Sequence, residues 1–168
     1  MGCFPKTQVS MNHGSLSEIK NGLQTLDEAT LQNLCLRLAK YKKENKELLG
    51  YLLFDASDEP GYIRSIKGEI DSLFDELSDR NLYIVKKMVR KILRVTNKYI
   101  RYSGLPQTEL ELRIYFCEKI RTEHIPLTPG TVLFNLYHQQ LKKINSVLDK
   151  LPEDFRADYS VTLHAIRI

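Results

Sequence analysis

The segment from Asn81 to Tyr102 constrains the fold more than any other stretch, because it has the pattern of a single amphipathic helix. Its Leu, Ile, Val, Met and Tyr residues recur mainly at three- and four-residue spacings, which gathers them on one half of a helix. The other half is cationic. We therefore expect the apolar half to pack in a core and the cationic half to face solvent or a partner.

The cationic half of this helix is unusual because nothing in the segment balances its charge. No Asp or Glu lies between Asn81 and Tyr102. The 168-residue chain has a net charge of +4, and its remaining residues are acidic on balance, so this segment supplies the whole positive excess. A nucleic-acid binder with a uniformly basic surface would spread its charge over several elements. The candidate partner-binding residues are Tyr83, Lys86, Lys87, Arg90, Lys91, Arg94, Asn97, Lys98 and Arg101.

One explanation for these cations is internal neutralisation. Residues 55–80 hold eight acids and three bases, and we expect this segment to run antiparallel beside the basic helix. Exposed ion pairs contribute only about 0–1 kcal/mol each, so neutralisation alone does not explain why the cations are clustered.

The other explanation is an anionic partner. The sequence favours a non-enzymatic interaction module whose cationic helix binds an acidic or phosphate-bearing protein. Contact with a nucleic-acid backbone through the same helix is the alternative, with Tyr83 and Asn97 beside the cations. The sequence contains no helix-turn-helix, RNA-recognition or zinc pattern in support of that alternative.

Two pairs of acidic residues provide a second, enzymatic alternative. Glu44 with Glu47 and Glu76 with Asp79 resemble the ExxE and ExxD pairs of all-α nucleotide pyrophosphohydrolases. That resemblance implies a magnesium ion held by carboxylates. However, a Pro-Gly turn lies between the pairs, and all four acids fall near predicted helix ends on solvated faces. We therefore expect no catalytic residue, metal ion or cofactor.

Capping patterns predict where several helices begin. Ser15, Thr25 and Thr108 are each followed three residues later by Glu, which is the capping-box arrangement. Ser78 or Asp79 is expected to cap the basic helix. In the helix that follows Thr108, the residues expected to face the core are Leu110, Ile114, Cys117 and Ile120.

The predicted fold is all-α, with six to seven helices arranged as stacked antiparallel hairpins or as an irregular bundle. The helices fall into the pairs 27–55, 60–102 and 107–151, and the first pair is interpreted as a hairpin broken near residues 42–47. We expect a disordered leader at 1–14, one helical domain at 15–158, and an extended or disordered tail at 159–168.

The segments LDEATLQNLCLRLAKY and KENKELLGYLL resemble small bacterial all-helical proteins of the HEAT-like helical-hairpin type. The resemblance covers about a quarter of the chain, and it implies stacked helical hairpins and a binding role.

Cysteine usage and hydropathy bear on the environment of the protein. Cys35 and Cys117 lie on apolar helix faces, where we expect buried thiols rather than disulfides. There is no apolar run of about 18 residues for a membrane span. These features favour a cytoplasmic protein, and they leave its oligomeric state open.

Overall fold

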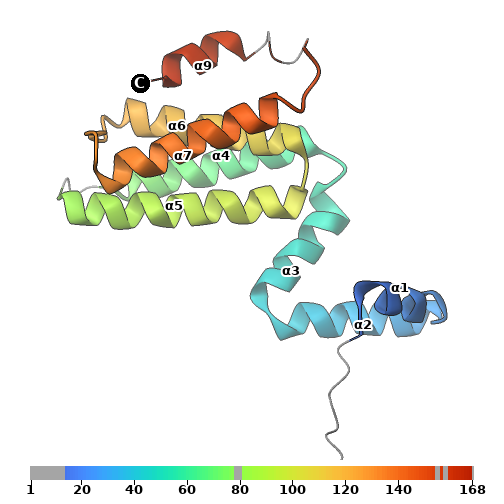
Figure 1. Ribbon diagram of the computed structural model, residues 1–168. Coiled ribbons are helices and arrows are strands. Elements are labelled where there is room, and N and C mark those ends of the chain that lie inside the picture. The colour runs from blue at the N-terminus through green and yellow to red at the C-terminus, as the bar shows by residue number, and fades with distance from the viewer. Residues whose placement is uncertain (1–13, 78–80, 154–155, 157–158, 168) are drawn as a thin grey trace, which may run out of the picture. The chain divides into compact units, whose positions relative to one another are not determined.

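The computed structural model describes residues 14–77, 81–153, 156 and 159–167. Over these residues the chain is helical and forms no strand, which confirms the all-α prediction (Figure 1). The expected leader at 1–14 lies almost wholly outside the described residues. The chain forms two compact units, Met1–Glu47 and Leu48–Ile168. Two compact units can still unfold together as one cooperative domain. The single domain expected at 15–158 therefore stays a prediction.

The first unit is built from α1 (Leu16–Gln24), α2 (Glu28–Tyr41) and the start of α3 (Lys43–Gly50). The capping box of Ser15 is present as predicted. The next helix begins later than expected, because the carboxylate of Asp27, and not Thr25, accepts from the Thr30 N–H. These three helices contain no buried residue.

The segment 27–55 is interrupted as the sequence predicted. Lys42 has an extended backbone, with φ −140° and ψ 144°, and it separates α2 from α3. A short π-helix, η1 (Tyr51–Asp55), then continues from α3.

The second unit contains the hydrophobic core. Asp58 caps the helix that follows η1, and Gly104, with a φ of 67°, ends the basic helix in a left-handed conformation that suits glycine. The helices of this unit after η1 are α4 (Glu59–Asp75), α5 (Leu82–Ser103), α6 (Pro106–Thr122), α7 (Val132–Leu148) and α9 (Ser160–Ile166).

Helix α6 lies at the centre of this unit, in contact with α4, α5, α7 and α9 (Figure 1). The residues expected to face inward are buried, but so are residues on the other sides of the helix, including Leu112, Arg113 and Phe116. The sequence identified only one face because a helix surrounded by neighbours has no single apolar stripe.

Two further helix starts differ from the expected ones. Asn81 caps α5 through its side chain, which accepts from the Tyr83 N–H, whereas Ser78 and Asp79 lie outside the described residues. Helix α6 begins at Pro106, whose fixed φ suits a first helical position. Thr108 is therefore not a cap. It is buried inside α6 and donates to Glu59.

The C-terminal tail is helical and not extended. Within residues 159–167, α9 packs on α6, Leu163 is partly buried and Ile166 is buried. The Tyr137 hydroxyl donates to the Ile166 carbonyl oxygen at 2.6 Å. Leu163 and Ile166 are three residues apart, a spacing that places both on one face of a helix, and packing on α6 selects the helix.

The two described cysteines differ in burial. Cys117 is buried as expected, and burial raises the pKa of its thiol to about 12. Cys35 is exposed on α2, so the expectation of a second buried thiol is wrong.

Candidate functional site

Packing divides the cationic side of α5 into two flanks. The buried stripe of this helix recurs every three or four residues and faces the core. Residues on one flank lie toward α4, and residues on the other line a groove shared with α7. The buried stripe consists of Val85, Val89, Ile92, Thr96 and Ile100.

The flank toward α4 engages its cations within the protein. Lys91 Nζ lies 3.2 Å from Glu76 Oε2. Lys98 Nζ lies 4.4 Å from the ring centroid of Tyr99, a cation–π geometry, and 6.0 Å from that of Tyr102. These two of the predicted site residues therefore have neighbours within their own chain.

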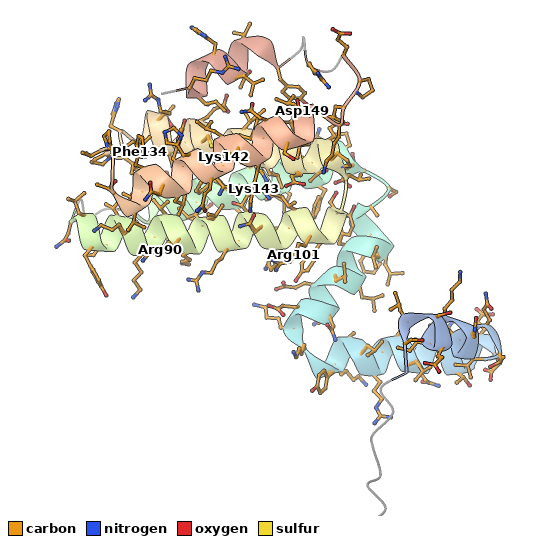
Figure 2. All side chains as sticks on the ribbon, in the orientation of Figure 1. Arg90, Arg101, Phe134, Lys142, Lys143 and Asp149 are labelled. Atoms are coloured by element: carbon orange, nitrogen blue, oxygen red, sulfur yellow. The ribbon has the colours of Figure 1, made fainter. Side chains whose placement is uncertain are left out.

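The flank toward α7 forms an open groove of about 750 Å³. Its lining combines cationic side chains with apolar ones, and Tyr83 at one end is 74% exposed. Figure 2 shows the side chain of Arg90 directed away from the bundle. The lining residues are Tyr83, Lys86, Lys87, Arg90, Leu93, Arg94, Asn97 and Val132.

No carboxylate side chain is contributed by either of the two helices that line this groove. Residues 82–103 and 132–148 contain no Asp or Glu, and α7 adds Lys142 and Lys143 to the positive charge (Figure 2). Among the residues that the structure describes, no acid lies within 4.0 Å of the charged groups of the four groove cations. Positive potential therefore accumulates along the groove.

The acids of α4 bind mostly to other partners. Asp71 accepts from the Tyr115 hydroxyl at 2.6 Å and pairs with Lys119 Nζ at 3.1 Å, both on α6. Glu69 accepts from the Tyr99 hydroxyl at 2.6 Å. Internal neutralisation of the basic helix therefore includes the pair between Lys91 and Glu76, and it does not reach Lys86, Lys87, Arg90 or Arg94 within the described residues.

Asn97 has a structural contact that the sequence did not indicate. Its Oδ1 accepts from Arg113 Nη1 at 3.0 Å, and Gln140 Oε1 accepts from the same nitrogen at 2.7 Å. Arg113 also donates through Nε to Glu109 Oε1 at 2.8 Å. This buried cluster ties α5, α6 and α7 together at the level of Asn97, beneath one end of the groove.

Arg101 occupies the last turn of α5 and does not line the groove. Its exposed side chain projects outward in Figure 2. A cation in this position interacts favourably with the C-terminal end of the helix dipole. Arg101 is therefore the one predicted site residue that is exposed but separate from both flanks.

Another carboxylate joins its own helix to three others, near the end of α5 that is opposite Tyr83. Glu59, at the start of α4, accepts hydrogen bonds from the hydroxyls of Tyr51, Ser103 and Thr108. The last two come from the end of α5 and the start of α6. Both carboxylate oxygens of Glu59 accept hydrogen bonds from the protein, which is a structural role.

The acidic pairs of the enzymatic alternative do not form a described metal site. Glu76 pairs with Lys91, Glu47 Oε1 lies 3.7 Å from Lys43 Nζ, and Asp79 falls outside the described residues. No cluster of three or more His, Cys, Asp or Glu side chains suited to a metal ion occurs in the part of the chain that is described.

A second open cavity, of about 950 Å³, lies between the end of α6 and α9. It is lined by groups of both charges, including Glu118, Lys119 and His124. Burial raises the pKa of Glu118, and the nearby Lys67 opposes this effect. Lys119 is already paired with Asp71 and with Glu123, at 3.1 and 3.4 Å. This cavity therefore has no accumulated charge comparable to that of the α5–α7 groove.

The sequence identified the cations of the groove but missed its second wall. Val132 and the absence of acids from α7 were visible in the sequence, yet nothing local indicated that α7 would lie beside α5. Among the described residues, no helix is long and apolar enough to cross a membrane. No known protein family, curated protein or solved structure matches this chain.

Proposed function

We propose that this protein is a non-enzymatic helical interaction module, and that the groove between α5 and α7 binds an acidic segment of a partner protein. The observation that supports the proposal is the absence of any Asp or Glu from both helices that line the groove. Lys86, Lys87, Arg90 and Arg94 therefore meet no carboxylate from either wall.

The arrangement of these cations has a cost in the free protein. Lys86, Arg90 and Arg94 follow one another at four-residue spacing, and like charges at this spacing destabilise a helix by about 0.2–0.5 kcal/mol per pair. Carboxylates from outside the chain would replace this repulsion with attraction. An acidic partner is therefore favoured both by the charges and by their spacing.

A nucleic-acid backbone is the alternative partner for the same groove. The exposed Tyr83 supports it, because an aromatic ring beside cations can stack on a base. The apolar lining at Leu93 and Val132 and the acidic balance of the rest of the chain favour a protein. Binding to DNA or RNA would weaken steeply as salt is raised.

The test is a charge reversal of three exposed groove residues, Lys87→Glu, Arg90→Glu and Arg94→Glu. A matched control, Lys20→Glu, Arg64→Glu and Lys150→Glu, makes the same change in net charge at exposed positions outside the groove. We expect the groove variant to keep its helical circular dichroism and to lose an acidic partner captured by the natural chain from its host, and the control to keep that partner.

Two results would overturn the proposal. The groove variant would unfold if its cations belonged to an internal network. If the groove variant captured the same partner as the control, binding would take place on another surface. The alternatives are separated by measuring the affinity for duplex and single-stranded DNA as the salt concentration is raised. Only the nucleic-acid alternative predicts an affinity for DNA that falls steeply with salt and requires the groove cations.

Two finer expectations accompany the proposal. HEAT-like stacking of the helical hairpins and a cytoplasmic location are both compatible with a binding module. The magnesium-dependent pyrophosphohydrolase alternative has no supporting observation in the described residues.

A further inference from the structure

We infer that the groove between α5 and α7 takes one kind of acidic segment: an amphipathic helix with carboxylates one turn apart beside bulky apolar side chains. This inference rests on the proposed function, because it specifies the partner segment for the same groove. It depends on the two kinds of surface that meet there. The cations are Lys86, Lys87, Arg90 and Arg94, and the apolar groups are Tyr83, Leu93 and Val132.

The cations have the spacing of a helix. Lys86, Arg90 and Arg94 each lie about 6 Å further along α5 than the one before. Carboxylates four residues apart on a second helix have the same rise, so a helix lying along the groove would place one acid beside each cation. The groove extends from Tyr83 to Asn97, about 21 Å of helix, which matches roughly four turns of a partner.

The apolar groups of the groove are partly exposed to water in the free protein. Val132 is 43% exposed at the start of α7, and Leu93 is partly buried on α5. A phosphate backbone or an inorganic anion makes polar contacts and leaves such side chains uncovered. An amphipathic helix covers them with its own apolar residues, and laying a helix in a groove is a common mode of peptide recognition.

Other occupants are disfavoured by what the chain offers. A second copy of this protein would need an unengaged row of acids, whereas Glu69, Asp71 and Glu76 on α4 are already bonded within the described residues. The positive charge of the groove would suit an anionic membrane surface, but a groove between two helices is concave toward its ligand. The occupant that satisfies both charge and shape is a single acidic helix.

The experiment titrates the full chain with a labelled probe peptide of about 18 residues, which forms roughly 27 Å of helix. The peptide is rich in alanine, with Glu at every fourth position and Leu immediately before each Glu. A second peptide replaces every Leu by Ser and keeps the charge. We expect the Leu peptide to bind at least about tenfold more tightly than the Ser peptide, because each covered Leu adds hydrophobic free energy.

A variant of the protein locates the contact. Val132→Ser removes an apolar group from the groove without touching a cation, and Val132 is exposed at the start of α7, outside the hydrophobic core. We expect this variant to bind the Leu peptide several-fold more weakly than the natural chain does, and to bind the Ser peptide with unchanged affinity. The difference between these two effects is the coupling energy of a double-mutant cycle. Amide resonances of Tyr83, Leu93 and Val132 should shift when the Leu peptide binds.

The outcomes separate this inference from the proposed function. Equal affinity for the two peptides, or no affinity for either, overturns the amphipathic helix, while loss of an acidic host partner in the groove variant would still support the proposed function. Preference for a single-stranded oligonucleotide or for phosphatidylserine vesicles over both peptides overturns the inference and the proposed function together. A change in oligomeric state in the groove variant would instead assign the groove to a second copy and overturn the inference.

Discussion

Helices α5 and α6 are adjacent in the sequence and both rich in charged residues, but they are used in opposite ways. Helix α5 buries one stripe and leaves its other half to solvent, whereas α6 is covered by four helices. The difference is visible in two arginines. Arg94 is exposed in the groove, and Arg113 is 5% exposed within hydrogen-bonding distance of Glu109, Asn97 and Gln140. Residue type therefore does not decide whether a cation is held in a buried hydrogen-bonded cluster or left exposed to solvent.

The contrast in burial between α5 and α6 also explains why the groove is open to solvent. Because α6 occupies the centre, α5 and α7 both pack on it and form a groove along one side. The buried network around Arg113 holds the three helices together beneath that groove. The burial of α6 and the exposure of one half of α5 are in this sense two consequences of one arrangement.

The largest difference in stability between the two helices should appear when one aromatic side chain on each is truncated. Phe116→Ala on α6 removes a ring with no exposed surface that packs on Phe74, with 6.4 Å between ring centroids. We expect it to lower the free energy of unfolding by about 4 kcal/mol. Tyr83→Ala on α5 should change it by less than about 0.5 kcal/mol, because that ring is largely exposed. Urea unfolding measures both, and similar losses would contradict the contrast between the helices.

The arginine pair should give the next largest difference. Arg113→Ala leaves Gln140 and Glu109 without their guanidinium partner and opens a cavity, so we expect a loss of about 3 kcal/mol in the free energy of unfolding. Arg94→Ala should be neutral to within about 0.5 kcal/mol. If Arg94→Ala destabilises the protein as much as Arg113→Ala does, the groove cations are structural.

An intermediate effect is expected where the two helices meet. Glu59→Gln replaces a carboxylate oxygen by an NH₂ group, so the hydroxyls of Tyr51, Ser103 and Thr108 can no longer all donate to this side chain. We expect a loss of about 1.5 kcal/mol by thermal or urea unfolding. When Ser103→Ala is added to Glu59→Gln, the free energy of unfolding should fall little further. A full additional penalty would show that these hydroxyls act independently of Glu59.

The smallest effect concerns pH, and it sharpens the comparison because α5 has no acid. Burial raises the pKa of Glu118 on α6 above the ordinary value of a glutamate, with Lys67 opposing the rise. Between the unfolded and folded pKa values the native state binds more protons than the unfolded state, so this group lowers stability as pH rises through that window. Glu118→Gln should therefore be relatively more stable at pH 7 than at pH 4, measured against the natural chain. A pH-independent difference would contradict this assignment.

The fold could be predicted where local chemistry decides it. The stripe of α5, its end at Gly104 and the break at Lys42 follow from residue spacing and backbone preferences within a few positions. The starts of α2 and α6 could not, because several capping residues lie close together and the choice between Thr25 and Asp27, or between Thr108 and Pro106, depends on how the chain enters the helix. The helical tail depended on packing against α6.

The candidate site was predicted in part. The sequence identified the cations, since an uninterrupted run of one charge sign is a local property. It missed the internal role of Asn97 and the contribution of Val132, because both depend on helices that lie more than ten residues away along the chain. The partner of these residues stays a prediction.

The sequence by itself determined that this chain is helical and that one helix carries cations without acids, because helix periodicity and net charge are properties of neighbouring residues. Only the tertiary structure decided that Glu76, at the end of α4, would engage Lys91. It also decided that Val132, on a helix without a carboxylate, would line the groove with Lys86, Lys87, Arg90 and Arg94. The physical reason is that apolar burial selects which helices meet across long separations in the chain. The charges on their flanks are brought together as a consequence of that packing.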